Sequence, residues 1–97
     1  MVWTSELGTP EHQLHHVPVV LAGGTGYFDK PGRYIYWRQT NVVPGPLGDE
    51  LQGPPHNRLL VSIARAMGVD TEAVGMTSVP LKDGATLDCT GELDRLR

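Results

Sequence analysis

Residues 57–68 read NRLLVSIARAMG, and this stretch decides the fold because its pattern predicts the one helix of the chain. Asn57 can cap the first turn, and Gly68 suits the position after the last turn, where the backbone becomes left-handed. The face that recurs at helical spacing is apolar and consists of Leu60, Ile63, Ala64 and Met67. We therefore expect this face to be buried against a sheet.

The strands of that sheet are expected before the helix. Residues 17–22 read VPVVLA, a continuous apolar run followed by glycines, which is typical of a strand buried on both faces. Residues 1–4 (MVWT) and 32–39 (GRYIYWRQ) predict two further strands, since β-branched and aromatic side chains favour sheets. Aromatic residues in these strands are expected to build the small core: Trp3, Tyr34, Tyr36 and Trp37.

Composition places these elements in one small domain over residues 1–97. The 12 glycines and 8 prolines exceed a fifth of the chain and predict many turns. We expect residues 40–55 to be a loop or linker and residues 70–97 to be a loop-rich tail. The predicted fold class is α/β: a small, fragment-like domain with a short mixed or parallel sheet, one packed helix and long loops.

Charge and residue usage exclude several classes of protein. A net charge of −3 without basic blocks argues against binding of nucleic acid or an anionic membrane. The single cysteine, Cys89, rules out an intramolecular disulfide, and its neighbour Asp88 favours the unreactive thiol. No apolar run is long enough to span a bilayer, and the first residues do not have the pattern of a signal peptide. The sequence as written therefore predicts a cytoplasmic location.

Landmarks along nearly the whole chain carry a family resemblance. They are VWTSELG at residues 2–8, His12, VPVVLAGG at 17–24, GRY at 32–34, PHNRLL at 55–60, AMGV at 66–69 and TGEL at 90–93. In this order they resemble the C-terminal end of an uncharacterised bacterial family named for an HxxSHH motif, which is similar to the sulfatase and alkaline-phosphatase clan. The naming motif is missing here, and Phe28 and Asp29 replace a longer glycine run. The resemblance implies the last strands and helix of a larger, largely exported α/β protein.

A cluster of histidines and carboxylates is the clearest candidate for chemistry. His12, His15 and His16 lie near Glu6 and Glu11, and such side chains bind zinc and similar ions. If residues 12–16 form a helical turn, His12 and His16 share a face; if they are extended, His15 and His16 point apart. Polar loop residues bonded to the backbone are the alternative interpretation. By resemblance, Ser5, Glu6 and His12 occupy positions where relatives in the clan place metal-binding groups.

These observations lead to two functional hypotheses. The first is a remnant or subdomain of a metal-dependent, sulfatase- or phosphatase-like hydrolase. In it Glu6, His12 and His16 bind a divalent metal such as zinc, and His15 or His16 acts as general base. Because the upstream part of the resembled domain is missing, an apolar face and a sheet edge should be open. The second hypothesis is therefore a non-catalytic interaction module, a homo-oligomer that buries Val17, Val19, Leu21 or the segment 34–37 between copies.

Overall fold

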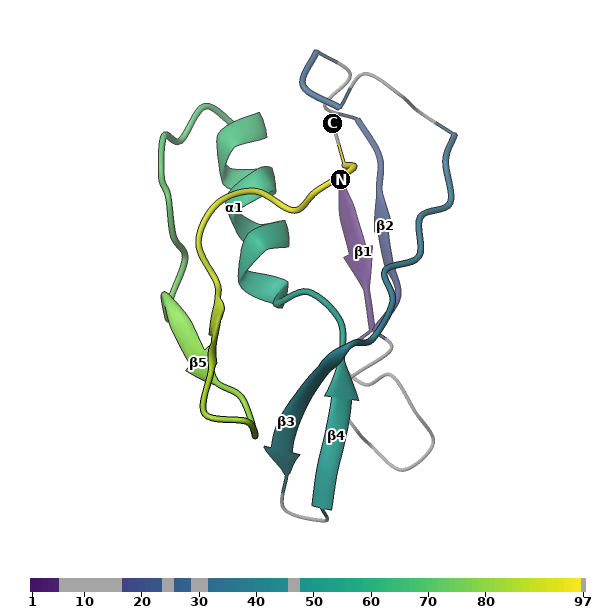
Figure 1. Cartoon of the computed structure of the whole chain (residues 1–97). Helices are drawn as coiled ribbons and strands as arrows, with labels where there is room; N and C mark the ends of the chain where they lie inside the picture. Colours follow the sequence, from purple (N-terminus) through teal and green to yellow (C-terminus); the bar gives the residue numbers. More distant parts are fainter. Residues whose placement is uncertain (6–16, 24–25, 29–31, 46–47, 97) are drawn as a thin grey trace.

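The computed structural model describes residues 1–5, 17–23, 26–28, 32–45 and 48–96. Three two-stranded antiparallel sheets and one helix follow one another in this described part of the chain (Figure 1). The elements are β1 (Val2–Thr4), β2 (Val19–Leu21), β3 (Asn41–Gly45), β4 (Gly48–Gln52), α1 (His56–Ala66), β5 (Ser78–Pro80) and β6 (Thr86–Asp88). The mixture of helix and sheet agrees with the predicted class only loosely, because the described sheets are antiparallel rather than parallel or mixed.

β1 and β2 form the N-terminal hairpin, in the two places where strands were predicted. Trp3 pairs with Val20, and the ladder continues to Met1 and Ala22, which exchange backbone hydrogen bonds. The expectation that residues 17–22 are buried on both faces is wrong, since Val20 is exposed. The physical reason is that β2 belongs to a two-stranded ribbon and not to the middle of a layered sheet.

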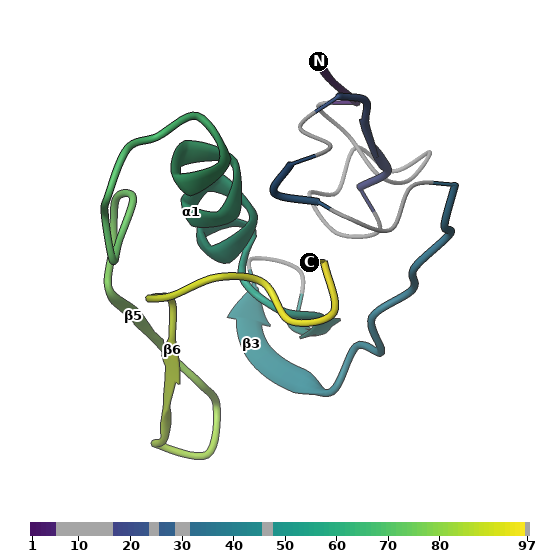
Figure 2. The same cartoon turned by 90° about the horizontal axis from the view of Figure 1, so that it is seen from above.

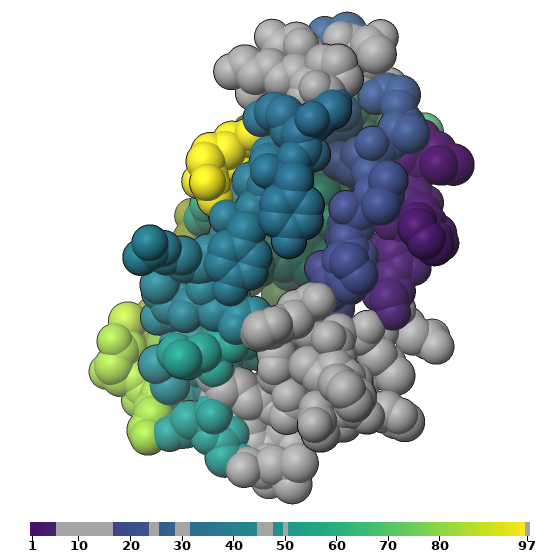
Figure 3. Space-filling view, turned by 90° about the vertical axis from the view of Figure 1, so that its right-hand side faces the viewer, coloured from purple at the N-terminus to yellow at the C-terminus, as the bar shows by residue number. Residues whose placement is uncertain are grey.

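The third predicted strand, residues 32–39, is not part of any sheet. The segment runs beside β2 in Figures 1 and 3, and its residues alternate between exposed and half-buried from Tyr34 to Gln39. The prediction of a strand from the aromatic residues of this segment is therefore wrong. Strand pairing needs a neighbouring backbone in register, and the segment has none among the described strands.

The β3–β4 hairpin lies where a loop or linker was predicted over residues 40–55, so that prediction is wrong. Its strands pair from Asn41 opposite Gln52 to Gly45 opposite Gly48. Pro44 stands opposite Asp49, and since proline has no N–H, this position suits the hairpin only at an edge. The prolines and glycines that suggested a linker in fact mark the turn and the edge of a ribbon.

Helix α1 ends as predicted, but it begins differently. Gly68 takes a φ of 87°, and the backbone N–H of Val69 reaches the carbonyl of Ala64 at 2.9 Å. This closes the last turn in the glycine-dependent manner expected. At the start Pro55 is the N-cap without a side-chain bond, and Asn57 instead donates to the carbonyl of Val74 at 2.7 Å.

The core sits between α1 and the tail rather than between α1 and a sheet. The described residues that are buried in the helix are Leu59, Val61 and Ser62, joined by Cys89 from the tail. The tail beyond β6 runs alongside the helix in both orientations (Figures 1 and 2), and the N–H of Leu93 donates to Ser62 Oγ at 3.0 Å. Thus the predicted tail contributes two short strands and one buried residue, Cys89, to the core.

The phase of the helix therefore differs from the prediction. The expected buried side is only half-buried at Leu60, Ile63 and Ala64, and Met67 is 79% exposed. Apolar residues lie on both sides of this helix, so periodicity alone favoured the side with more of them, which contains Leu60, Ile63, Ala64 and Met67. The opposite side is buried because the tail satisfies the polar groups of Ser62, Arg58 and Arg65 there.

Two neighbouring leucines test this phase. Leu59→Ala should lower the free energy of unfolding by about 2–5 kcal/mol, because it opens a cavity under the tail. Leu60→Ala is the matched control with the same chemistry one residue away, and it should lose about half as much or less because that side chain is only half-buried. Urea denaturation followed by circular dichroism measures both. A larger loss of unfolding free energy for Leu60→Ala than for Leu59→Ala would show that the face predicted from the sequence is the buried one.

Candidate functional site

The predicted metal ligands and general bases lie outside the described residues. Glu6, His12, His15 and His16 all belong to the stretch between β1 and β2. What the structure describes is the base of that stretch, where Thr4 pairs with Val19. Within residues 1–5, 17–23, 26–28, 32–45 and 48–96, no group of three histidine, cysteine or carboxylate side chains is arranged to hold a metal ion.

The glycine-rich run after β2 is partly described. Gly23 has a φ of 92°, a conformation that favours glycine, and a Cβ placed there would lie 3.8 Å from the backbone nitrogen of Met1. This supports the interpretation of Gly23 as a turn residue at the end of the hairpin. Residues 24 and 25, which belong to this run, lie outside the described part of the chain.

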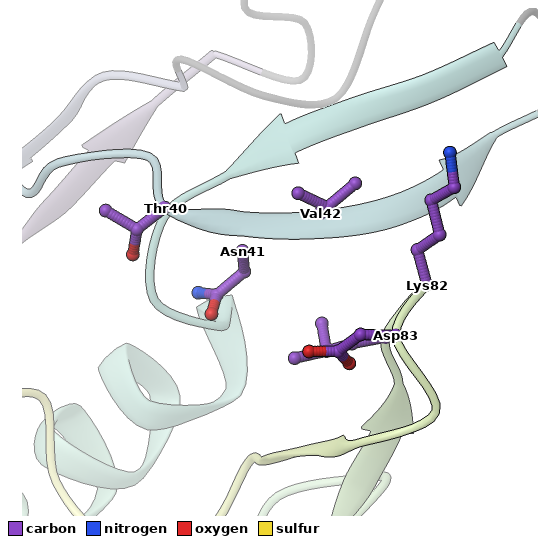
Figure 4. A pocket seen from close by; sticks show the side chains of 6 residues that line it. Thr40, Asn41, Val42, Lys82 and Asp83 are labelled. Carbon is purple, nitrogen blue, oxygen red and sulfur yellow. The ribbon is translucent and has the colours of Figure 1, made fainter.

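An open cleft of about 630 Å³ lies between β3 and the turn that joins β5 to β6 (Figure 4). Its polar groups already hold the two hairpins together. The backbone N–H of Lys82 donates to the carbonyl of Val42 at 3.0 Å, and the Lys82 ammonium pairs with Asp49. Asp83 accepts the N–H of Ala85 at 2.9 Å. The cleft is lined by Thr40, Asn41, Val42, Leu81, Lys82 and Asp83, a set with neither histidine nor a nucleophilic thiol. These contacts hold β3 and the β5–β6 turn together. The sequence did not indicate them because the two segments are far apart in the chain.

A second polar cluster surrounds Arg65 on α1. Its guanidinium bonds to Glu72 at 2.7 Å, to Glu92 at 3.1 Å and to the carbonyl of Thr71 at 2.9 Å. Tyr27 donates its hydroxyl to the other oxygen of Glu92. Desolvation alone lowers the pKa of Arg65, but the bond to Glu92 and the charges of both glutamates raise it above its ordinary value. The arginine therefore stays charged and ties the helix to the tail.

The single cysteine is part of the core. Cys89 is fully buried, with its Sγ 3.6 Å from the carbonyl of Leu87. Burial raises the pKa of this thiol; Arg58 opposes the shift, and Asp88 adds to it. The expected inertness of Cys89 thus has desolvation as its main cause, with the neighbouring carboxylate as a smaller one.

The aromatic residues predicted to build the core are mostly at the surface, so that prediction is wrong. Trp3 is 70% exposed and Tyr34 is 92% exposed. Trp37 is half-buried because it takes part in polar contacts with the tail: its Nε1 donates to Asp94 at 2.8 Å, and the Arg95 guanidinium lies 5.3 Å from its ring centroid. Among the described residues, α1 packs against the tail rather than over the ribbon of β1 and β2, and Trp3 stays exposed.

These exposed side chains gather on one side of the molecule. Residues 1–5, 17–23 and 32–40 lie next to one another on the face that Figure 3 presents. We define the N-terminal apolar face by large exposed side chains of these segments: Trp3, Val20, Tyr34 and Tyr36. Neither β1 nor β2 contains a charged residue, whereas Arg33 and Arg38 of the third segment are charged and exposed. An aromatic-rich surface of this kind is typical of a protein interaction site.

The whole chain exposes more surface than a folded monomer of its size. A 10.6 kDa protein is expected to expose about 5,500 Å², whereas this chain exposes 6832 Å². Its radius of gyration is 14.2 Å, against about 12.5 Å expected for this length. The excess surface, about 1,400 Å² on this scale, exceeds the area that one partner contributes to an ordinary interface, about 800 Å².

Comparison with protein-family models, curated proteins and solved structures found no match for this chain. In the described residues no helix is long and apolar enough to cross a membrane. The surface and the local geometry are therefore the basis for a functional proposal.

The buried thiol gives a direct test of the core. Cys89 should react very slowly with a thiol reagent at pH 8 in the folded chain, because the thiol is enclosed and its raised pKa leaves little thiolate. Urea should release it in step with unfolding measured by circular dichroism. Rapid stoichiometric labelling without urea would contradict the packing of the tail on α1.

Proposed function

We propose that this protein is a non-catalytic interaction module that associates with itself through the N-terminal apolar face. The observation that supports this most directly is the position of Trp3, Tyr34 and Tyr36 at the surface of a chain whose described core is very small. Aromatic side chains give much of the energy of protein interfaces, because each buries a large area at a low entropic cost. A second copy offers the same aromatic surface and can associate with it symmetrically.

The balance of surface area favours this proposal over a monomeric function. The excess exposure of the chain, about 1,400 Å² relative to a typical monomer, is enough for a standard two-chain interface. Within this face, Arg33 and Arg38 of segment 32–40 are charged and exposed, whereas β1 and β2 carry no charged side chain. Charge repulsion between side chains therefore does not oppose contact between two copies of β1.

Two substitutions on the face test the proposal. The parent chain is expected to sediment as a dimer at micromolar concentration, while Trp3→Ser and Tyr34→Ser should each shift it toward the 10.6 kDa monomer. Leu51→Ser is the matched control, since Leu51 is an exposed apolar residue on β4 outside the face. Its dimer should persist. A parent chain that sediments as a monomer, or two face variants that still form dimers, would contradict the proposal.

We also propose a divalent-metal site in the stretch between β1 and β2, as in a remnant of a sulfatase- or phosphatase-like hydrolase. The supporting observation is the pairing of Thr4 with Val19, which joins the two ends of this stretch in one hairpin. Glu6, His12 and His16 thereby belong to one loop whose two ends are joined by strand pairing. Because the ends are already joined, less conformational entropy is lost when the three side chains bind one ion. His15 or His16 would then serve as further ligand or general base.

Zinc titration tests this site separately. Addition of zinc should raise the melting temperature of a chain purified without a histidine tag, and a chelator should reverse the rise. His12→Ala should abolish the rise and leave the stability of the metal-free protein nearly unchanged. His56→Ala is the control, because His56 is exposed at the start of α1. A rise that survives His12→Ala, or no rise in the parent, would eliminate the metal proposal and leave the interaction module intact.

A further inference from the structure

We infer that two copies of this chain join edge to edge through β1, antiparallel about a twofold axis at Trp3, to form one four-stranded sheet. This inference rests on the proposed function and specifies its geometry. In strand order the sheet is β2 and β1 of one copy followed by β1 and β2 of the other. The evidence is the direction of the backbone groups in β1 and the contrast between its outer edge and the edges of β3 and β6.

The hydrogen-bond pattern of the N-terminal hairpin decides which backbone groups are free. Met1 and Ala22 exchange two backbone bonds, so they are a hydrogen-bonded pair. Such pairs alternate along an antiparallel ladder, which makes Trp3 and Val20 the next one. The N–H and C=O groups of the two intervening β1 residues, Val2 and Thr4, therefore point away from β2. No described backbone group bonds to them.

These groups are spaced for pairing with their own copies. With Trp3 at the twofold axis, Val2 of one copy lies opposite Thr4 of the other, and each of the two such pairs exchanges two N–H···O bonds. Trp3 then faces its counterpart in a non-hydrogen-bonded pair, where side chains approach most closely, about 4.5 Å between Cα atoms. This register agrees with the β1–β2 ladder, because a residue bonded toward one neighbouring strand is not bonded toward the other.

The described edges of β3 and β6 are protected in ways that the edge of β1 is not. On β3, Pro44 lacks an N–H, and the carbonyl of Val42 is already taken by Lys82. On β6, the carbonyl of Asp88 accepts Nε of Arg58 at 3.1 Å. Proline and cationic side chains are common means of preventing edge-to-edge association. β1 has neither, and Figure 3 shows residues 1–5 at the rim of the N-terminal apolar face.

Packing on the exposed side of the new sheet supports the same arrangement. Trp3 and Val20 are cross-strand partners, so both point to one side of the ribbon, and both are exposed. In the four-stranded sheet they form a continuous row with two tryptophans in the middle. Aromatic cross-strand pairs stabilise sheets, and a four-stranded sheet is far more stable than an isolated two-stranded one.

Cysteine cross-linking of the full chain tests this register. Two Trp3→Cys chains should form a disulfide-linked dimer when diamide removes two electrons and two protons from the thiols, because their Cα atoms lie within the bonding range of about 4.4–6.8 Å. Val20→Cys is the matched control on the same exposed row. Its two copies lie three strand spacings apart, about 14 Å, and should not be linked. The parent chain, whose only thiol is buried, sets the background.

A second variant retains the tryptophan in case its loss weakens association. The double variant Val2→Cys/Thr4→Cys should give dimers linked between the two copies at both pairs. Failure of both the double variant and Trp3→Cys to cross-link, while the parent sediments as a dimer, would overturn edge pairing and leave self-association standing. Disulfide formation by Val20→Cys as efficient as that by Trp3→Cys would also overturn edge pairing, since it would indicate that the two copies stack face to face. A parent chain that is a monomer would refute both proposals together.

Discussion

The packing of the tail on α1 is the interaction on which the described structure depends. Ser62 is fully buried, and a buried hydroxyl is tolerated only when its hydrogen bonds are made. Its oxygen accepts the N–H of Leu93 and donates to the carbonyl of Arg58 at 3.1 Å, so one side chain joins the helix to the tail. Val61 and Cys89 become buried around this contact. The rest of the chain is attached to this small centre.

The N-terminal half is attached to that centre mainly by polar contacts. Arg33 donates to the carbonyls of Arg95 and Leu96 at 2.7 and 2.8 Å, and Tyr27 donates to Glu92. Contacts of this kind hold segments in place but bury little apolar area, and each contributes only about 0.5–1.5 kcal/mol. Consequently the hairpin of β1 and β2 keeps an apolar face open. A second copy paired at the β1 edge would extend this hairpin to a four-stranded sheet.

Self-association and metal binding are compatible in this arrangement. The stretch with Glu6 and His12 follows β1, and an antiparallel twofold pairing at Trp3 sends the two copies of it to opposite ends of the sheet. A metal in this stretch would stabilise the end of the hairpin, and a more ordered hairpin presents a better edge to its partner. The two activities would then be linked through β1, although each has its own test.

Local patterns in the sequence determined the elements that depend on local interactions. The helix and its end at Gly68 were predictable, as were strands within residues 1–4 and 17–22, because capping, positive φ and β-branched side chains act within a few residues. The association between copies that was expected from the apolar strand at 17–22 stays a prediction. The tertiary structure alone decided the antiparallel pairing, the β3–β4 hairpin, the buried side of α1 and the exposure of Trp3 and Tyr34. The physical reason is that each of these depends on contacts between distant parts of the chain. The helix has apolar residues on two sides, and the tail at Leu93, 31 residues after Ser62, selects the side that holds Ser62.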